Sequence, residues 1–158
     1  MSMADSRDFI YGRIPHRPPF LWLDKVVSFA EGTLIAEKTI PADLDIFQGH
    51  YPDYPIMPGV LLCEAVFQAG ALLIAELIRH EQNGENPLAV KGVPVLTRIN
   101  SAKFKREVKP GQTITLEVKL KEQMGSAWFL KGRVLVQGKT AVKVEFACAM
   151  SDVLGPKQ

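Results

Sequence analysis

Apolar and polar residues alternate with a period of two along several short stretches of the chain. Every second residue from Ile114 to Leu120 is apolar, and so is every second residue from Val142 to Phe146. This period is typical of β-strands that bury one face. The strand-like stretches are 21–29, 33–40, 95–108, 113–123, 127–137 and 139–150. Short glycine-containing connectors join the last of these, so we expect them to be antiparallel neighbours.

Residues 60–78 depart from this pattern, because they are apolar on nearly every helical face. The only strongly polar side chains among them are Glu64, Gln68 and Glu76. Pro58 suits a first helical turn, so the segment predicts a helix from about residue 58 to about residue 80 that is buried all round. Its length also allows a membrane span, but the charges within it and the lack of a second apolar span argue against one.

The order of elements is therefore two strands, one helix and then the remaining strands. The simplest architecture is of the α+β class, a curved antiparallel sheet wrapped around one long buried central helix. A length of 158 residues fits a single domain over 1–158, with 1–13 as an N-terminal lead-in and 151–158 as a C-terminal tail. The sequence GENP at 84–87 predicts a loop after the helix.

Charge and cysteine content narrow the functional classes. A net charge of +2 and a pI near 8.5 are too mild to indicate nucleic-acid binding. Cys63 and Cys148 lie in apolar runs, without metal-ligand spacing to each other or to a histidine, so we expect two core thiols in a reduced compartment. The first residues lack the apolar core of a signal peptide, and the cytoplasm is the expected location.

The richest segment chemically is 47–68, FQGHYPDYPIMPGVLLCEAVFQ. Its prolines and glycines fix the backbone path between His50 and the helix start. Glu64 and Gln68 are four residues apart, so they share a helix face and can hydrogen-bond. Glu64 lies roughly 8 to 9 Å from the helix N-terminus, where unpaired N–H groups favour an anion. Each residue alone is more easily interpreted as structural, but together they favour a catalytic site.

The motifs GHYPDYPIMPGVLLCEAVFQ, IPHRPPFLWLDKV and AKFKREVKPGQ resemble the FabZ-type (3R)-hydroxyacyl-[acyl-carrier-protein] dehydratase family, which has a hot-dog fold. The resemblance covers about residues 13 to 150. It implies that His50 and Glu64 are catalytic, that Gly59 N–H binds the thioester carbonyl and that Gln68 orients Glu64. Tyr51 and Val60, next to these residues, are expected to bind substrate. No metal or organic cofactor is called for.

The chemistry of water elimination suggests how the roles divide. Histidine titrates near neutrality and suits the base, so His50 is expected to take the α-proton. Glu64 is expected to act as the acid, because burial in an apolar setting raises the pKa of a carboxyl. A sister family that also isomerises the double bond has aspartate in place of Glu64, which favours dehydration without isomerisation. The resemblance implies a role in fatty acid biosynthesis, while a lipid A precursor or specialised pathway remains open.

The resemblance also implies partners. Members share active sites across a homodimer, with His50 of one subunit facing Glu64 of the other, and their dimers commonly assemble into hexamers as trimers of dimers. The carrier protein that bears the substrate is acidic. The basic residues that could meet it are Arg98, Lys103, Lys105, Arg106 and Lys109. A solvated edge strand is the simpler interpretation of this basic run.

Several positions depart from the family pattern and leave chain length, gating and docking open. These positions are Tyr51, Asp53, Tyr54, Val95, Arg98 and Asn100. Three other functions also remain open. They are a hot-dog acyl thioesterase, in which a carboxylate activates water, a non-catalytic acyl-thioester-binding paralogue, and a nucleophilic pair of Cys63 with His50.

Overall fold

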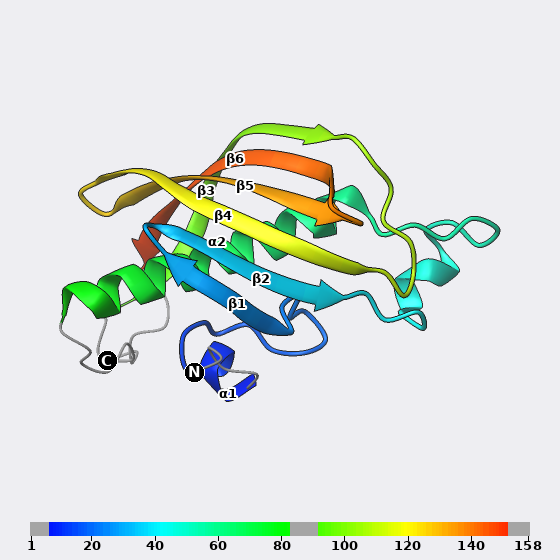
Figure 1. Ribbon diagram of the computed structural model, residues 1–158, viewed down its shortest axis with the longest axis horizontal. Helices are drawn as coiled ribbons and strands as arrows, with labels where there is room; N and C mark the ends of the chain where they lie inside the picture. The colour runs from blue at the N-terminus through cyan, green and yellow to red at the C-terminus, as the bar shows by residue number, and fades with distance from the viewer. Residues whose placement is uncertain (1–6, 83–91, 152–158) are drawn as a thin grey trace.

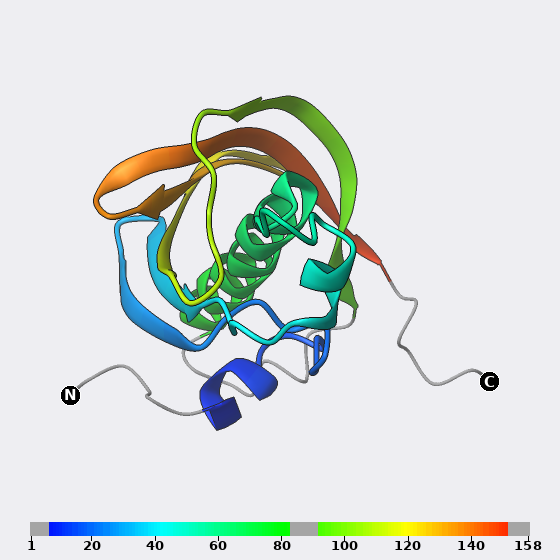
Figure 2. The same ribbon diagram turned by 90° about the vertical axis from the view of Figure 1, so that its right-hand side faces the viewer.

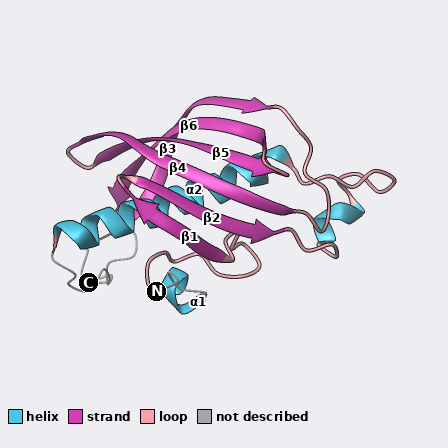
Figure 3. Cartoon of the chain, in the orientation of Figure 1, coloured by secondary structure: helices cyan, strands magenta, loops and turns pink. Residues whose placement is uncertain are grey.

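The computed structural model describes residues 7–82 and 92–151, and the predicted loop at 84–87 lies outside them. In chain order the elements are α1 (Arg7–Tyr11), β1 (Lys25–Ala30), β2 (Thr33–Thr39), η1 (Asp45–Gln48), α2 (Gly59–Glu81), β3 (Val93–Phe104), β4 (Thr113–Met124), β5 (Ala127–Val136) and β6 (Lys139–Ser151). The strands form one antiparallel sheet in the order β1-β2-β4-β5-β6-β3 (Figures 1 and 3).

The sheet curves around α2, which runs along its concave face (Figure 2). The alternating apolar residues of β4 and β6 point at the helix and are buried, apart from the partly buried Leu120, as the period of two predicts. Two glycines permit the close approach. A Cβ on Gly132 would lie 2.3 Å from Cγ1 of Val66, and one on Gly70 would lie 2.8 Å from the Phe146 ring. The predicted curved antiparallel sheet around one central helix is confirmed.

The burial of α2 is that of a core helix. By length and composition it could cross a membrane, yet 78% of its apolar window is buried inside the protein. The prediction of a helix from about 58 to about 80 is confirmed, with Pro58 in the N-cap position. The expectation that it is buried all round is wrong at its first turn, where Val60 is 71% exposed, because the sheet of one chain contacts that turn on the Gly59 side and leaves Val60 uncovered.

The first strand begins later than predicted, at Lys25 rather than residue 21. Leu21, Trp22 and Leu23 are buried but lie outside the sheet. The N–H of Trp22 donates to Oε1 of Gln68 on α2. This side-chain acceptor takes the place of a neighbouring strand. The helices α1 and η1 were not predicted; each is five residues or fewer and lacks a long periodic pattern.

The third strand ends at Phe104 rather than residue 108. The N–H groups of Lys105 and Arg106 both donate to the carbonyl of Ala141, after which the chain leaves β6. The carbonyl of Val108 then accepts from the N–H of Met57, just before α2. The basic run after β3 is therefore a loop that crosses the start of the central helix.

Candidate active site

The N-terminal turn of α2 offers free backbone donors. The carbonyl of Pro58 accepts from the N–H groups of Leu61 and Leu62, whereas those of Gly59 and Val60 have no recorded acceptor among the described residues. Such N–H groups carry the positive end of the helix dipole. A Cβ on Gly59 would lie 2.7 Å from two ring atoms of Phe104. Glycine therefore lets the Phe104 ring lie directly against the helix start.

Gln68 lies one turn after Glu64 and is fully buried. Its Oε1 accepts from the N–H of Trp22 at 2.8 Å, and its Nε2 donates to the carbonyl of Phe20, also at 2.8 Å. The same Nε2 donates to Oε1 of Glu64 at 3.1 Å. The predicted hydrogen bond between Glu64 and Gln68 is confirmed, and the orientation of the amide is fixed by the segment before β1.

The carboxyl of Glu64 is mostly buried, with its side chain 22% exposed. Burial raises its pKa, as predicted, and the hydrogen bond from Gln68 opposes part of that rise. A second nitrogen lies nearby, Nε2 of His16 at 3.7 Å from Oε1. The pKa of His16 is lowered, first by burial and then by the positive charge of Arg17. Burial therefore disfavours the charged forms of both groups.

His50 lies in the loop that precedes α2. Its Nδ1 is 2.9 Å from the carbonyl of Ile56, and its own carbonyl accepts from the N–H of Ile56. Because a carbonyl can only accept, Nδ1 carries the hydrogen and Nε2 presents a lone pair. The ring stacks on Tyr51 with 4.4 Å between centroids. The hydroxyl of Tyr54 donates to Glu107 and ties the loop to the segment after β3.

The structure brings some of the predicted site residues together and leaves others apart. Glu64 and Gln68 are in contact, and Gly59 and Val60 form the helix start. No hydrogen bond or ion pair joins His50 to Glu64 within one chain over residues 7–82 and 92–151.

Two residues near the site were missed from the sequence, His16 and Phe104. Pro15 and Pro18 lie on either side of His16 and restrict its backbone. They are the sequence feature that could have indicated a fixed position for His16.

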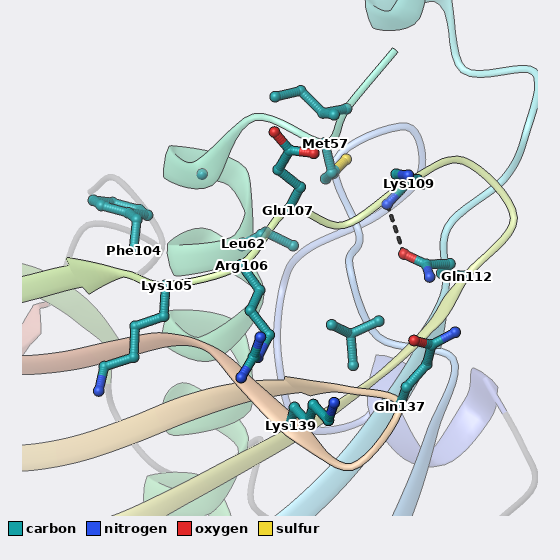
Figure 4. A pocket seen from close by; sticks show the side chains of 13 residues that line it. Met57, Leu62, Phe104, Lys105, Arg106, Glu107, Lys109, Gln112, Gln137 and Lys139 are labelled. Carbon is teal, nitrogen blue, oxygen red and sulfur yellow. Dashed lines mark hydrogen bonds between the residues drawn. The ribbon is translucent and has the colours of Figure 1, made fainter. Parts of the chain in front are cut away.

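A groove with a volume of about 900 Å³ opens beside the helix start (Figure 4). Gly59, Leu62 and Phe104 form part of its floor. Its basic residues, all from the loop after β3 or the start of β6, are Lys105, Arg106, Lys109 and Lys139. Of the basic residues predicted to meet a carrier protein, Lys105, Arg106 and Lys109 therefore line this groove, whereas Arg98 and Lys103 lie along the edge strand β3.

Neither cysteine has the character of a nucleophile. Cys63 and Cys148 are free and buried. Burial raises the pKa of both thiols, and the nearby charge of Glu64 helps to raise that of Cys148 to about 12. A thiol of raised pKa is unreactive near neutrality, so the pair of Cys63 with His50 is not a site.

The fold and this site define a class of protein, the hot-dog fold with a carboxyl-bearing central helix. A chain of the dehydratase heterocomplex ApeI:P from Xenorhabdus doucetiae has a TM-score of 0.71 at 15% identity, with 91% of each chain covered. The PaaI protein from the phenylacetic acid degradation operon of E. coli has a TM-score of 0.58 at 17% identity, with 80% of this chain and 78% of that one covered. At such identities the likeness shows the fold alone.

Sequence comparison gives the family. The family model described as a FabA-like domain matches residues 14–145. The 3-hydroxyacyl-[acyl-carrier-protein] dehydratase FabZ of Clostridium perfringens is 42% identical over 137 residues, 87% of this chain and 92% of that protein. The FabZ of Staphylococcus carnosus is 40% identical over 142 residues, 89% and 91% of the two chains. The chain belongs to the FabA-like family and, within it, to the FabZ-type dehydratases.

Proposed function

We propose that the protein removes water from a (3R)-3-hydroxyacyl thioester on acyl carrier protein to give the trans-2-enoyl thioester, in fatty acid biosynthesis. The observation that carries this proposal is the Glu64 carboxyl, whose pKa is raised and which Gln68 holds on the buried helix. Membership of the FabZ-type dehydratases supports the choice of reaction. Free buried cysteines agree with a cytoplasmic enzyme.

His50 is the base. Its Nδ1–H is engaged by the carbonyl of Ile56, which leaves the Nε2 lone pair to accept the proton from C2 of the substrate. The carbonyl contact also stabilises the imidazolium that forms, because Nδ1–H becomes a stronger donor when the ring is charged. Tyr51, stacked on the ring and largely exposed, limits the directions from which the acyl chain can reach Nε2.

Glu64 is the acid, and the helix start binds the oxygen that gains charge. As the C2–H bond breaks, the thioester oxygen becomes enolate-like, and the unpaired N–H of Gly59 can donate to it. The C3–O bond then breaks as Glu64 donates its proton to the leaving hydroxyl, and C2 and C3 form the double bond. The products are enoyl thioester and water, with one proton gained by His50 and one lost by Glu64. Val60 borders this path to the carboxyl.

The direct test measures enoyl product, free thiol and binding for one set of 3-hydroxyacyl thioesters of graded chain length. We expect enoyl absorbance to increase and free thiol to stay constant. His50→Ala and Glu64→Gln should each lower kcat by about a thousandfold or more, since each removes a proton-transfer group. Free thiol without enoyl product would establish a thioesterase instead, and saturable binding without either product would establish a non-catalytic binder.

Each active site is completed by a second copy of the chain. The edge strand β3 has one unpaired side along Val93–Phe104, and it exposes Val95, Leu96, Ile99 and Phe104. An unpaired apolar edge is a template for pairing with another strand. Tyr51 and Val60 are exposed as well. Pairing through β3 would cover these residues and let His50 of one copy reach Glu64 of the other, and such dimers would assemble further into a hexamer.

Mixing two inactive variants tests the shared site. In a dimer of one His50→Ala chain with one Glu64→Gln chain, one of the two sites keeps both native groups. If the subunits exchange at random, half of the dimers are mixed and about a quarter of wild-type activity should return. No recovery after exchange, confirmed by mass spectrometry of tagged chains, would show that His50 and Glu64 work within one chain. Sedimentation velocity of the wild type separates dimer from hexamer.

The basic groove beside the helix start is the proposed contact for the acidic carrier protein. Lys105 and Arg106 border it where the substrate must enter toward Gly59 (Figure 4). Charge reversal of Lys105 and Arg106 should increase KM for carrier-bound substrate and lower its salt dependence, while KM for the same acyl group on pantetheine should stay unchanged. Lys131→Glu, on the exposed outer face of β5, is the control. If the charge-reversed protein and the Lys131→Glu control had the same KM for carrier-bound substrate, the groove would not be the docking surface.

A further inference from the structure

The segment that leads into β1 places a second imidazole against the Glu64 carboxyl. Nε2 of His16 lies 3.7 Å from Oε1 of Glu64, and both side chains are about three-quarters buried. The position of His16 is fixed by its neighbour, because the guanidinium of Arg17 donates to the carbonyls of Tyr11, Ile14 and His16 itself. The ring of His16 is therefore held at the acid of the site by a well-anchored backbone.

The hydrogen bonds around Glu64 determine which nitrogen of His16 carries hydrogen. Gln68 Nε2 is an amide donor, so Oε1 of Glu64 accepts. An imidazole nitrogen that faces the same accepting oxygen is favourable only as N–H, which makes His16 the Nε2–H tautomer. Its Nδ1 is buried without a hydrogen-bond partner in the part of the chain that the structure describes. An unpaired lone pair there is tolerated better than an unpaired N–H would be.

We infer that His16 is a positioning residue of the dehydration, which acts with Gln68 to reserve Oε1 of Glu64 as the accepting oxygen and so places the transferable proton on Oε2. This inference rests on the proposed function. A contact of 3.7 Å is longer than a hydrogen bond, so His16 acts through the dipole of its N–H. The consequence is that the acid presents its hydroxyl, and not its carbonyl oxygen, to the leaving group.

The other groups that interact with Glu64 leave this role to His16. Cys148, on β6, is held as a neutral thiol by its raised pKa. Burial, and then the positive charge of Arg17, lower the pKa of His16 and so disfavour its charged form. In the proposed dimer, His50 of the second copy would face the carboxyl from the substrate side. Among residues 7–82 and 92–151, His16 is thus the titratable group whose nitrogen lies next to one oxygen of the Glu64 carboxyl.

Two substitutions distinguish a donor from a packing group. His16→Gln keeps an amide N–H near the Nε2 position, whereas His16→Phe keeps the ring and removes the donor. We expect the phenylalanine variant to lose about tenfold in kcat with KM nearly unchanged, and the glutamine variant to stay within about threefold of wild type. In the phenylalanine variant the basic limb of the kcat profile should also move to higher pH, because the N–H no longer favours the carboxylate. If His16→Phe were at least as active as His16→Gln, the inference would be overturned.

The tautomer of His16 can be determined without an activity assay. The chain has 3 histidines, so long-range proton–nitrogen spectra of the labelled protein near pH 7 can be assigned by single substitutions. We expect His16 as the Nε2–H form and His50 as the Nδ1–H form in one spectrum. His16 found as the Nδ1–H form would overturn the inference. A wild type that performs no dehydration would overturn the proposed function instead, and the spectrum would still decide the tautomer of His16.

Discussion

Gln68→Leu would remove the hydrogen bond that holds the carboxyl of Glu64, the proposed acid, while nearly keeping the volume of the Gln68 side chain. The buried N–H of Trp22 would lose its acceptor, which costs about 1 to 3 kcal/mol. The Phe20 carbonyl and Glu64 lie nearer to solvent and can bind water, so together they add about 1 kcal/mol. Burying an apolar side chain in place of an amide returns about 1 kcal/mol. We expect a net loss of about 2 kcal/mol in the free energy of unfolding.

Urea denaturation at one fixed protein concentration measures this loss, since association contributes to the stability of an oligomer. The control is Gln123→Leu on β4, an exposed position whose recorded hydrogen bond to the Gly125 carbonyl is 3.5 Å long. It should change stability by less than about 0.5 kcal/mol. The kcat of Gln68→Leu should also fall at least about tenfold, because the carboxyl loses its fixed orientation. A Gln68→Leu protein as stable as the control would refute this role of Gln68.

Three further predictions concern the core. Gly70→Ala should destabilise the protein by about 1 kcal/mol in thermal unfolding, because the new Cβ lies 2.8 Å from the Phe146 ring and this outweighs the better helix propensity; a rise in Tm would contradict it. Arg13→Met should cost about 2 kcal/mol, because it leaves the buried carboxylate of Glu76 with only the longer contacts to Arg79 at 4.0 Å and His80 at 3.9 Å. Glu76→Gln added to it should restore part of the loss in the same assay. Both buried cysteines should resist a thiol reagent at pH 8 until the protein is unfolded.

The sequence predicts the central helix and its chemistry well, because both depend on local spacing. Residues four apart on a helix share a face wherever the helix lies, so the hydrogen bond between Gln68 and Glu64 follows from position alone. The raised pKa of Glu64 follows in the same way from its apolar neighbours. The strands of the sheet were also found from their period of two, with ends that differ by a few residues.

The missed features depend on contacts between distant parts of the chain. Residues 21–23 have the composition of a strand, but the side chain of Gln68, 46 positions after Trp22, competes for the backbone N–H. The distance between His16 and Glu64 is likewise set by how the lead-in segment folds over α2. No periodicity encodes such a contact. The prolines around His16 indicate a fixed backbone but not the group toward which the ring points.

The burial predicted from the sequence and the burial observed in a single chain differ most clearly at the start of α2. Val60 belongs to a segment that is apolar on all faces, and yet it is exposed in one chain, as are Tyr51 and Phe104. A sequence pattern predicts that an apolar side chain is buried, but it does not indicate whether the same chain or another molecule buries it. The exposed apolar residues gather where His50 and Glu64 remain separate, at the helix start and along β3. A second copy of the chain paired through β3, as proposed above, would cover these apolar residues and complete the proposed site in one step.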